Sequence, residues 1–357
     1  MSFFALFLFI VAGYVIQQYL LNNSLDNVSY KIKPDKRCVE CDEQFTLNSS
    51  ITNNKRLPLF YLRVAERIPK KMVIRQEGVT RHDISSAIVS DTSSVEHSMF
   101  VMPYQKVSSK LNVSIPERGR YLLRGAELSA GDLLGINDSV TRIDTSEEIV
   151  VYPKKADIRK AEYAFGGYLG DVYVRRFIMP DPIEVAGFHE YTGNEPQRDI
   201  SWIQSLKKNQ MMVKQYDYTA QQLASVILDV DECKDMEAEK AYEITRSVCE
   251  YLENHRIRYS FYTNAQMATI NNIWSYIPDG IGSVHLNTVL EGLGRGEHNA
   301  VYSLDRLLQN VVTGRDETRC YVLVTADRNR KIDTIRKYER LLGQRVFVMD
   351  VKDVMMS

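Results

Sequence analysis

The spacing of apolar residues changes near residue 220, and this change constrains the fold more than any other feature. Before residue 150, apolar residues form short runs with partial alternation, separated by turn-forming clusters at 48–54 and 116–119. Such runs are typical of antiparallel strands. After residue 220, apolar runs of strand length alternate with segments of helical period. The sequence therefore predicts two regions of different architecture.

The first region predicts a sheet-only domain. Its expected strands are 43–47, 59–64, 98–102, 110–115 and 120–123. The polar stretch 83–94 is expected to be a loop, and no helical period intervenes. An antiparallel β-sandwich over residues 31–150 is the natural arrangement for such strands.

The second region, residues 220–357, predicts a doubly wound α/β domain. The expected strands are 223–230, 257–262, 320–325 and 345–351, and the expected helices are 235–255, 286–293, 303–312 and 329–342. Asp235 is a plausible N-cap of the first helix, and Gly343 ends the last one. Strands that alternate with helices favour parallel pairing with right-handed crossovers.

The N-terminus predicts a membrane anchor over residues 1–30. Residues 3–21 are largely apolar, and 19 helical residues rise about 28 Å, close to one hydrocarbon core. The basic residues Lys31, Lys33, Lys36 and Arg37 follow this run, so the positive-inside rule places the rest of the chain in the cytoplasm. A cleaved signal peptide is the alternative, but no basic residue precedes the run and no A-x-A site follows it.

Composition argues against nucleic acid as a partner. The formal net charge is −1, so the chain has no large cationic field. The cysteines are five in number and do not suggest a disulfide framework. Cys38 and Cys41 form a C-x-x-C pair that could be half a zinc site or a redox pair, although no second pair is present. No glycine-rich segment has the context of a nucleotide-binding loop.

The segment between the two regions carries a family resemblance. Residues 187–214 read GFHEYTGNEPQRDISWIQSLKKNQMMVK. This order of an aromatic turn, Arg198, Trp202 and a Ser/Lys segment resembles the signature of the domain-of-unknown-function 58 family. The signature segment is assigned to residues 151–219. The resemblance implies that a von Willebrand factor type A-like domain follows it. It also implies association with MoxR-type AAA+ ATPases.

The signature predicts structural roles more than catalytic ones. The residues that match it are Glu190, Tyr191, Gly193, Arg198, Ile200, Trp202, Ser205 and Lys207. Trp202 is expected to anchor the core, and Arg198 is expected to pair with Glu190 or Asp199 in a partly buried bridge. His189 and Asn194 stand where the family shows Arg and Asp, which is consistent with a swapped ion pair.

Polar residues at the strand ends of the second region predict a ligand site, because doubly wound sheets bind ligands there. These residues are Asp229, Asp231, Thr263, Asn264, Thr325, Asp327 and Asp350. The resemblance to von Willebrand A domains implies a degenerate metal-ion-dependent adhesion site for Mg²⁺ or Ca²⁺. Its expected ligands are Asp229, Asp231, Thr288 (or Thr263) and Asp327. Cys233 replaces a serine of the motif and is a poor ligand for a hard cation, so the alternative is that these acids only solvate strand ends.

The sequence favours binding over catalysis, with no catalytic residue assigned. We expect a membrane-anchored binding or assembly module, an adaptor for a MoxR-type ATPase by family resemblance, that binds no nucleotide. A metal-dependent hydrolase that uses Asp229, Asp231 and Asp327 is the alternative, but no His or Glu is placed beside these acids as a base. A third interpretation is an envelope protein with its domains outside.

Overall fold

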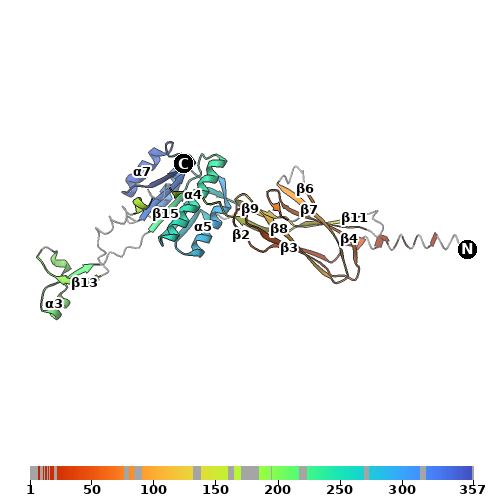
Figure 1. Ribbon diagram of the computed structural model, residues 1–357, viewed down its shortest axis with the longest axis horizontal. Coiled ribbons are helices and arrows are strands. Elements are labelled where there is room, and N and C mark those ends of the chain that lie inside the picture. The colour runs from red at the N-terminus through yellow and green to blue at the C-terminus, as the bar shows by residue number, and fades with distance from the viewer. Residues whose placement is uncertain are drawn as a thin grey trace. The chain divides into compact units, whose positions relative to one another are not determined.

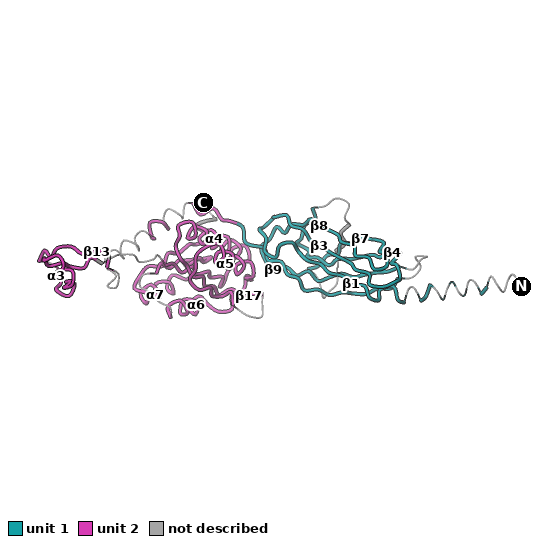
Figure 2. Tube along the Cα trace, turned by 90° about the horizontal axis from the view of Figure 1, so that it is seen from below, with its two compact units in different colours: residues 1–154 teal, residues 155–357 magenta. Residues whose placement is uncertain are grey.

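The chain forms two compact units, residues 1–154 and residues 155–357 (Figure 2). Their structure is a computed structural model that describes residues 7–8, 11, 13, 15, 17–19, 22–75, 80–83, 91–131, 138–159, 165–169, 185–193, 195–216, 223–268, 273–313 and 319–355. Each unit has its own sheets and is described by itself.

The described part of unit 1 consists mainly of strands. They are β1 (Val28–Pro34), β2 (Cys38–Val39), β3 (Phe45–Asn53), β4 (Leu59–Pro69), β5 (Val73–Ile74), β6 (Thr80–Asp83), β7 (Thr92–Val101), β8 (Lys106–Ser114), β9 (Gly119–Leu123), β10 (Ala126–Gly131), β11 (Asp138–Ile143) and β12 (Glu147–Val151). Three sheets result, with strand orders β1-β3-β8-β5, β11-β10-β4-β7-β6 and β2-β12-β9. The pairing is antiparallel except between β2 and β12.

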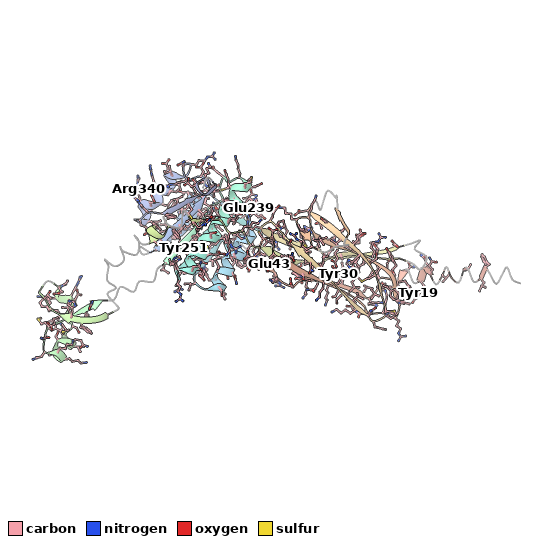
Figure 3. The ribbon with its side chains drawn as sticks, in the orientation of Figure 1. Tyr19, Tyr30, Glu43, Glu239, Tyr251 and Arg340 are labelled. Carbon is pink, nitrogen blue, oxygen red and sulfur yellow. The ribbon has the colours of Figure 1, made fainter. Side chains whose placement is uncertain are left out.

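Side chains from all three sheets fill one core. Strand alternation explains this, because every second residue of a strand points to the same face. In β3, for example, Phe45, Leu47 and Ile51 are buried. They join Leu62 of β4 and Ile149 of β12 in a single hydrophobic cluster. Tyr30, labelled in Figure 3, belongs to the same cluster.

Unit 1 has more strands than its sequence pattern predicts. The five expected strands overlap β3, β4, β7, β8 and β9. Strands β1, β10 and β11 were not predicted, and β11 has no buried residue in its pattern, so it lacks the apolar alternation that identifies a strand. The expected loop at 83–94 is replaced at its ends by β6 and β7, and residues 84–90 lie outside the described residues.

The main sheet of unit 2 has five strands in the order β18-β16-β15-β20-β21. Its central strand, β15, is labelled in Figure 1. The strands are β15 (Leu223–Leu228), β16 (Arg258–Thr263), β18 (Tyr276–Gly280), β20 (Arg319–Thr325) and β21 (Phe347–Asp350). Strands β15, β16, β20 and β21 pair in parallel, as the alternation with helices predicts. Strand β18 is antiparallel to β16. Only β17 and the short helix η2 are described between β16 and β18, whereas a parallel return usually needs a longer, helical crossover.

Five α-helices accompany this sheet. They are α4 (Asp235–Asn254), α5 (Ser283–Arg295), α6 (Leu304–Thr313), α7 (Ile332–Leu342) and α8 (Val351–Met355). Helices α6 and α7 pack on Ile227, Tyr321 and Leu323 of the sheet. Because successive side chains of a strand point to opposite faces, Val226 and Val324 lie on the face of the sheet opposite α6 and α7. Both are fully buried.

Unit 2 also contains two small sheets. Strands β17 (Ala265–Met267) and β19 (Gly296–Ala300) form one, next to η2 (Ile273–Ser275). Strands β13 (Val185–Glu190) and β14 (Met212–Tyr216) form the other. The connection between β13 and β14 contains η1 (Gln197–Asp199) and α3 (Trp202–Lys208). The described residues at 187–193 and 195–214 therefore lie on a hairpin with a helical connection.

The predicted fold class is wrong. Six sheets occur in the described part of the chain, where one sandwich and one doubly wound, von Willebrand A-like domain were expected. The antiparallel β18 and the separate β13–β14 and β17–β19 sheets interrupt the regular alternation that a doubly wound domain requires.

The predicted membrane anchor is also corrected. No helix among the described residues is long and apolar enough to cross a membrane. This finding contradicts the expected transmembrane helix at residues 1–30 and the single-pass membrane location that depended on it. Many residues of the expected span, including 3–6, 9, 10, 20 and 21, lie outside the described residues.

Candidate functional site

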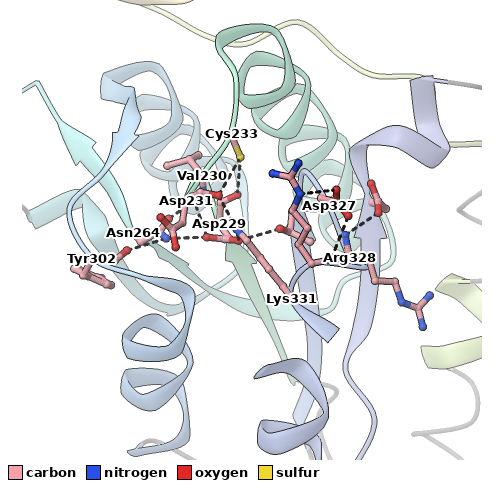
Figure 4. A network of polar contacts seen from close by, with 12 residues as sticks. Asp229, Val230, Asp231, Cys233, Asn264, Tyr302, Asp327, Arg328 and Lys331 are labelled. Atoms are coloured by element: carbon pink, nitrogen blue, oxygen red, sulfur yellow. Dashed lines mark hydrogen bonds and ion pairs between the residues drawn. The ribbon is translucent and has the colours of Figure 1, made fainter. Parts of the chain in front are cut away.

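Four hydrogen-bond donors converge on the carboxylate of Asp229, which is fully buried at the end of β15. Oδ1 accepts a bond of 2.8 Å from Asn264 Nδ2 and one of 3.1 Å from the backbone N–H of Asp231. Oδ2 accepts a bond of 2.9 Å from Thr325 Oγ1 and lies 2.5 Å from Lys331 Nζ. We call Asp229, Asp231, Asn264, Thr325 and Lys331 the rim network, and all of these except Thr325 are labelled in Figure 4.

The parallel sheet explains why these residues meet. Asn264 follows β16 and Thr325 ends β20, and both strands are hydrogen-bonded neighbours of β15. The carboxyl ends of parallel neighbours lie at one edge of a sheet, so their polar residues converge. The prediction that strand-end polar residues come together is confirmed for Asp229, Asn264 and Thr325.

Lys331 completes the network from outside the sheet. It is the N-cap residue of α7, and its side chain is 10% exposed. Its ammonium group donates to Asp229 Oδ2 and, at 2.6 Å, to the backbone oxygen of Asp231. A buried carboxylate is costly without a partner. Lys331 supplies the positive charge that Asp229 requires.

Lys331 was not among the site residues predicted from the sequence. A usable signal was present, because Arg328, Arg330 and Lys331 directly follow the strand that ends at Thr325. An acidic cluster follows β15, which pairs in parallel with β20, the strand that ends at Thr325. Opposite charges at adjacent strand ends predict an ion pair, but sequence alone does not indicate which basic residue is buried.

The residues of the expected metal site do not fit a hard cation. Four donors already occupy the oxygen atoms of Asp229, and the ammonium of Lys331 lies where a cation would have to bind.

Cys233 Sγ donates weakly to the backbone oxygens of Asp229 and Asp231, at 3.8 and 3.7 Å. Burial and the charge of Asp229 raise the pKa of the Cys233 thiol to about 12. The thiol is therefore neutral and a poor ligand. Among the described residues, no group of three or more His, Cys, Asp or Glu side chains could hold a metal ion.

The other two expected ligands have partners of their own. The Thr288 hydroxyl donates to the backbone oxygen of Val284 within α5, at 2.8 Å. Asp327 Oδ2 lies 2.6 Å from Lys352 Nζ, and Oδ1 accepts the backbone N–H of Asn329 at 3.1 Å. The hydrogen bond from Lys352 is the main cause of the lowered pKa of Asp327.

A cavity of about 100 Å³ opens beside the network. It is lined by Asp231, Glu232, Lys234, Glu237, Ala326, Asp327, Arg330, Lys331 and Lys352. Four of these side chains are acidic and four are basic. The volume is well below the roughly 300–1,000 Å³ of typical small-molecule pockets. The cavity can receive one side chain of a partner more readily than a whole substrate.

The backbone of Glu232 adds a strained position to this rim. Its φ is +57°, in the left-handed region, and its side chain is exposed. Non-glycine residues adopt this region at a cost, and such residues cluster at functional sites. The turn thereby holds a carboxylate outward at the mouth of the cavity.

The signature residues lie on the β13–β14 hairpin and not at the rim network. Glu190 ends β13, and the Tyr191 backbone N–H donates to the Met211 oxygen at 2.8 Å. Gly193 has a φ of +96°, and Ile200 is buried and bridges to Val213. Ser205 Oγ donates to the Ser201 oxygen and accepts the Met212 N–H, each at 2.8 Å. Lys207 lies in the last turn of α3.

Two expectations for this segment are wrong. Trp202 does not anchor the core, because it begins α3 and is 65% exposed. Arg198 lies 3.9 Å from Asp199, as expected, but its side chain is 85% exposed and not partly buried.

A carboxylate fixes the turn of the same hairpin. Glu195 accepts hydrogen bonds from the Thr192 hydroxyl at 2.7 Å and from the Thr192 N–H at 3.0 Å. His189 Nε2 lies 3.3 Å from the same carboxylate. The bond from the Thr192 hydroxyl is the main cause of the pKa of about 2 at Glu195. Asn194, the other half of the expected swapped pair, lies outside the described residues.

Comparison with known proteins gives no family. No protein-family model and no curated protein sequence matches the chain. Solved structures with partial likeness include the cohesin module of a family 33 glycoside hydrolase from Clostridium perfringens. It is 11% identical with a TM-score of 0.27, over 35% of this chain and 96% of that module. The CARDB domain of PF1109 from Pyrococcus furiosus is 11% identical with a TM-score of 0.22, over 35% of this chain and 91% of that domain.

A third such structure is Spo0M, a sporulation control protein from Bacillus subtilis. It is 10% identical with a TM-score of 0.21, over 46% of this chain and 58% of that protein. Likeness at this level supports no conclusion on function.

Proposed function

We propose that the chain is a protein-binding module whose contact site is the rim cavity of unit 2. The observation that carries this proposal is the saturation of Asp229. Four donors, one of them the buried ammonium of Lys331, satisfy its oxygens. An acid held in this way is not available as a general base or a metal ligand. The metal-dependent hydrolase, the alternative from sequence, therefore receives no support from this geometry.

The exposed charges around the cavity suit a polar protein contact. Glu232 is exposed, and the Arg330 side chain is 68% exposed. Charged side chains at the edge of an interface set specificity and association rate more than affinity. The partner that the family resemblance implies is a MoxR-type AAA+ ATPase, and it is part of this proposal.

Charge reversal at the rim tests the proposal. The full chain, immobilised, is exposed to a purified MoxR-type ATPase from the same organism. We expect Glu232→Lys and Arg330→Glu to weaken capture about tenfold, because each places like charge against the partner. Lys110→Glu is the matched control, since Lys110 is exposed on β8 of unit 1, and it should leave capture unchanged.

Two outcomes would refute parts of the proposal. Wild-type chain that captures no ATPase would remove the named partner. Capture that is unaffected by both rim variants would remove the rim as the contact site. Calorimetric titration with Mg²⁺ completes the test, and saturable binding that Asp229→Asn abolishes would restore the metal-site hypothesis.

A further inference from the structure

A second cavity, of about 480 Å³, lies in unit 1 and is unrelated to the rim. We call it the β1 hollow. It is lined by Lys31, Ile32, Lys33, Arg37, Thr145, Ser146 and Glu147. Its volume falls within the range of roughly 300–1,000 Å³ typical of small-molecule sites. Three of its seven lining residues carry a positive charge at neutral pH and one carries a negative charge.

The fold brings these cations together from two sheets. On β1, Lys31 and Lys33 are exposed while Ile32 between them is buried, so both lysines point to the same face. Arg37 comes from the segment before β2. Its backbone oxygen accepts the N–H of Val150 on β12 at 2.8 Å, which ties Arg37 to the sheet that contains Glu147.

The charge of the hollow is not neutralised locally. In the part of the chain that the structure describes, Lys31, Lys33 and Arg37 have no ion pair. Two carboxylates of neighbouring segments are paired with other cations. Glu43 (Figure 3) lies 2.5 Å from Lys36 Nζ, and Glu148 lies 2.7 Å from Arg120 Nε. Glu147 is the one acid of the lining, which leaves an excess of two positive charges.

We propose that the β1 hollow binds a phosphate group that carries about two negative charges. Lysine and arginine are the residues that bind phosphate in proteins, through charge-assisted hydrogen bonds. The Ser146 hydroxyl at the mouth can add a neutral hydrogen bond. The group could belong to a free phosphorylated compound or to a lipid headgroup, since the recognised chemistry is the same.

Edge protection is the alternative explanation for part of this charge. β1 is an edge strand of its sheet, and lysines on edge strands discourage pairing with another chain. That role requires charge on β1 alone. It explains neither the contribution of Arg37, which lies outside β1, nor the cavity that these residues line.

Calorimetric titration of the full chain with sodium pyrophosphate at low ionic strength tests the proposal. We expect saturable binding with a Kd on the order of 1 mM or below. Lys31→Gln, Lys33→Gln and Arg37→Gln should each weaken it about tenfold, through loss of one charge-assisted hydrogen bond. Lys36→Gln is the matched control, because Lys36 is adjacent in sequence but paired with Glu43 and absent from the lining. It should not change the Kd.

Glu147→Gln separates a true site from a folding defect. Removing the only acid of the lining should tighten pyrophosphate binding several-fold, and a misfolded variant cannot gain affinity. Saturable binding in wild type together with this gain supports the proposal. No saturable binding in wild type, or equal weakening by Lys36→Gln, overturns it.

A second experiment, with lipid vesicles, distinguishes a free phosphorylated compound from a lipid headgroup. Co-sedimentation with vesicles that contain phosphatidic acid, compared with phosphatidylcholine alone, reports the lipid source. Sedimentation that is specific to phosphatidic acid and lost in Arg37→Gln assigns a headgroup. Pyrophosphate binding without sedimentation assigns a free compound.

Discussion

A single buried lysine decides the chemistry of the rim. Asp229 is fully buried and Lys331 nearly so, and the two charges lie 2.5 Å apart. Pairs of this kind contribute little net stability relative to apolar residues, but removing one partner leaves an unpaired buried charge. Substitution of Lys331, alone and together with Asp229, therefore tests whether the pair is buried.

Lys331→Met should destabilise unit 2 by about 3–5 kcal/mol, because it leaves the Asp229 carboxylate buried without a countercharge. Urea unfolding monitored by circular dichroism measures the loss. The double variant Asp229→Asn/Lys331→Met should recover much of it, since no charge then remains buried. Lys352→Met, which removes the 45% exposed partner of Asp327, is the control and should cost far less, because solvent screens an exposed ion pair. Equal losses from Lys331→Met and Lys352→Met would contradict a buried pair.

Cys233 should be unreactive in the folded chain. Its pKa is raised to about 12, chiefly by burial, so the neutral thiol is favoured and almost no thiolate forms at pH 8. Maleimide labelling of a Cys38→Ser/Cys41→Ser variant, followed by peptide mapping, measures the rate at Cys233. We expect labelling in urea and almost none in buffer. Fast labelling in buffer would show that the thiol is ionised and that its surroundings differ from those described.

At the scale of elements, a buried arginine crosses the main sheet. Arg319 at the start of β20 donates to Asp279 of β18 at 2.6 and 2.7 Å. The same guanidinium group also donates to the Ser260 hydroxyl of β16 at 2.9 Å and to the Ser225 hydroxyl of β15 at 3.2 Å. The pKa of Arg319 is raised, chiefly by the bond to Asp279. One side chain thus links four adjacent strands and holds the antiparallel β18 at the edge.

Arg319→Met should destabilise unit 2 by about 1.5–3 kcal/mol, the range for hydrogen bonds to charged groups. The loss should be smaller than for Lys331→Met, because Asp279 remains 31% exposed to solvent and Ser225 and Ser260 still bond each other at 3.0 Å. Hydrogen exchange should show the largest loss of protection in β18. Lys337→Met, which removes an exposed pair with Asp305, is the control. Unchanged protection in β18 would mean that Arg319 does not hold that strand.

Helices whose apolar residues repeat with a clear period could be predicted from the sequence. Contacts between residues that are distant in the sequence could not. In α4, the expected face of Ala241, Ile244, Val248 and Leu252 is fully buried. In α6, Leu304, Leu307, Leu308 and Val311 are likewise buried as expected. Gly343 ends α7 with a φ of +71°. These features follow from spacing and backbone freedom within one element.

The failures involve partners that are distant in sequence. Lys331 pairs with Asp229, 102 residues away, and no local pattern encodes that contact. Trp202 is exposed although large aromatics usually lie in cores. The polar residues of the candidate site could be predicted because they follow strands, but the identity of the cation that satisfies them could not.

At the scale of the whole molecule, the two units have separate cores. The cluster of unit 1 contains only residues from β1–β12 and the segments between and before them, and the α6–α7 cluster contains only residues of unit 2. Domains with their own cores unfold as separate cooperative units unless a large interface couples them. We therefore expect two calorimetric transitions for the full chain.

Variants in each unit should move one transition and leave the other in place. Gly125 has a φ of +85°, and a Cβ there would lie 2.0 Å from the backbone oxygen of Ile143, so Gly125→Ala must distort the turn between β9 and β10. It should lower the transition of unit 1 by several degrees, since about 1 kcal/mol corresponds to roughly 2–8 °C in domains of this size. Lys331→Met should lower the other transition alone. If either variant shifts both transitions equally, or if wild type shows one transition with equal calorimetric and van't Hoff enthalpies, the two units unfold as one.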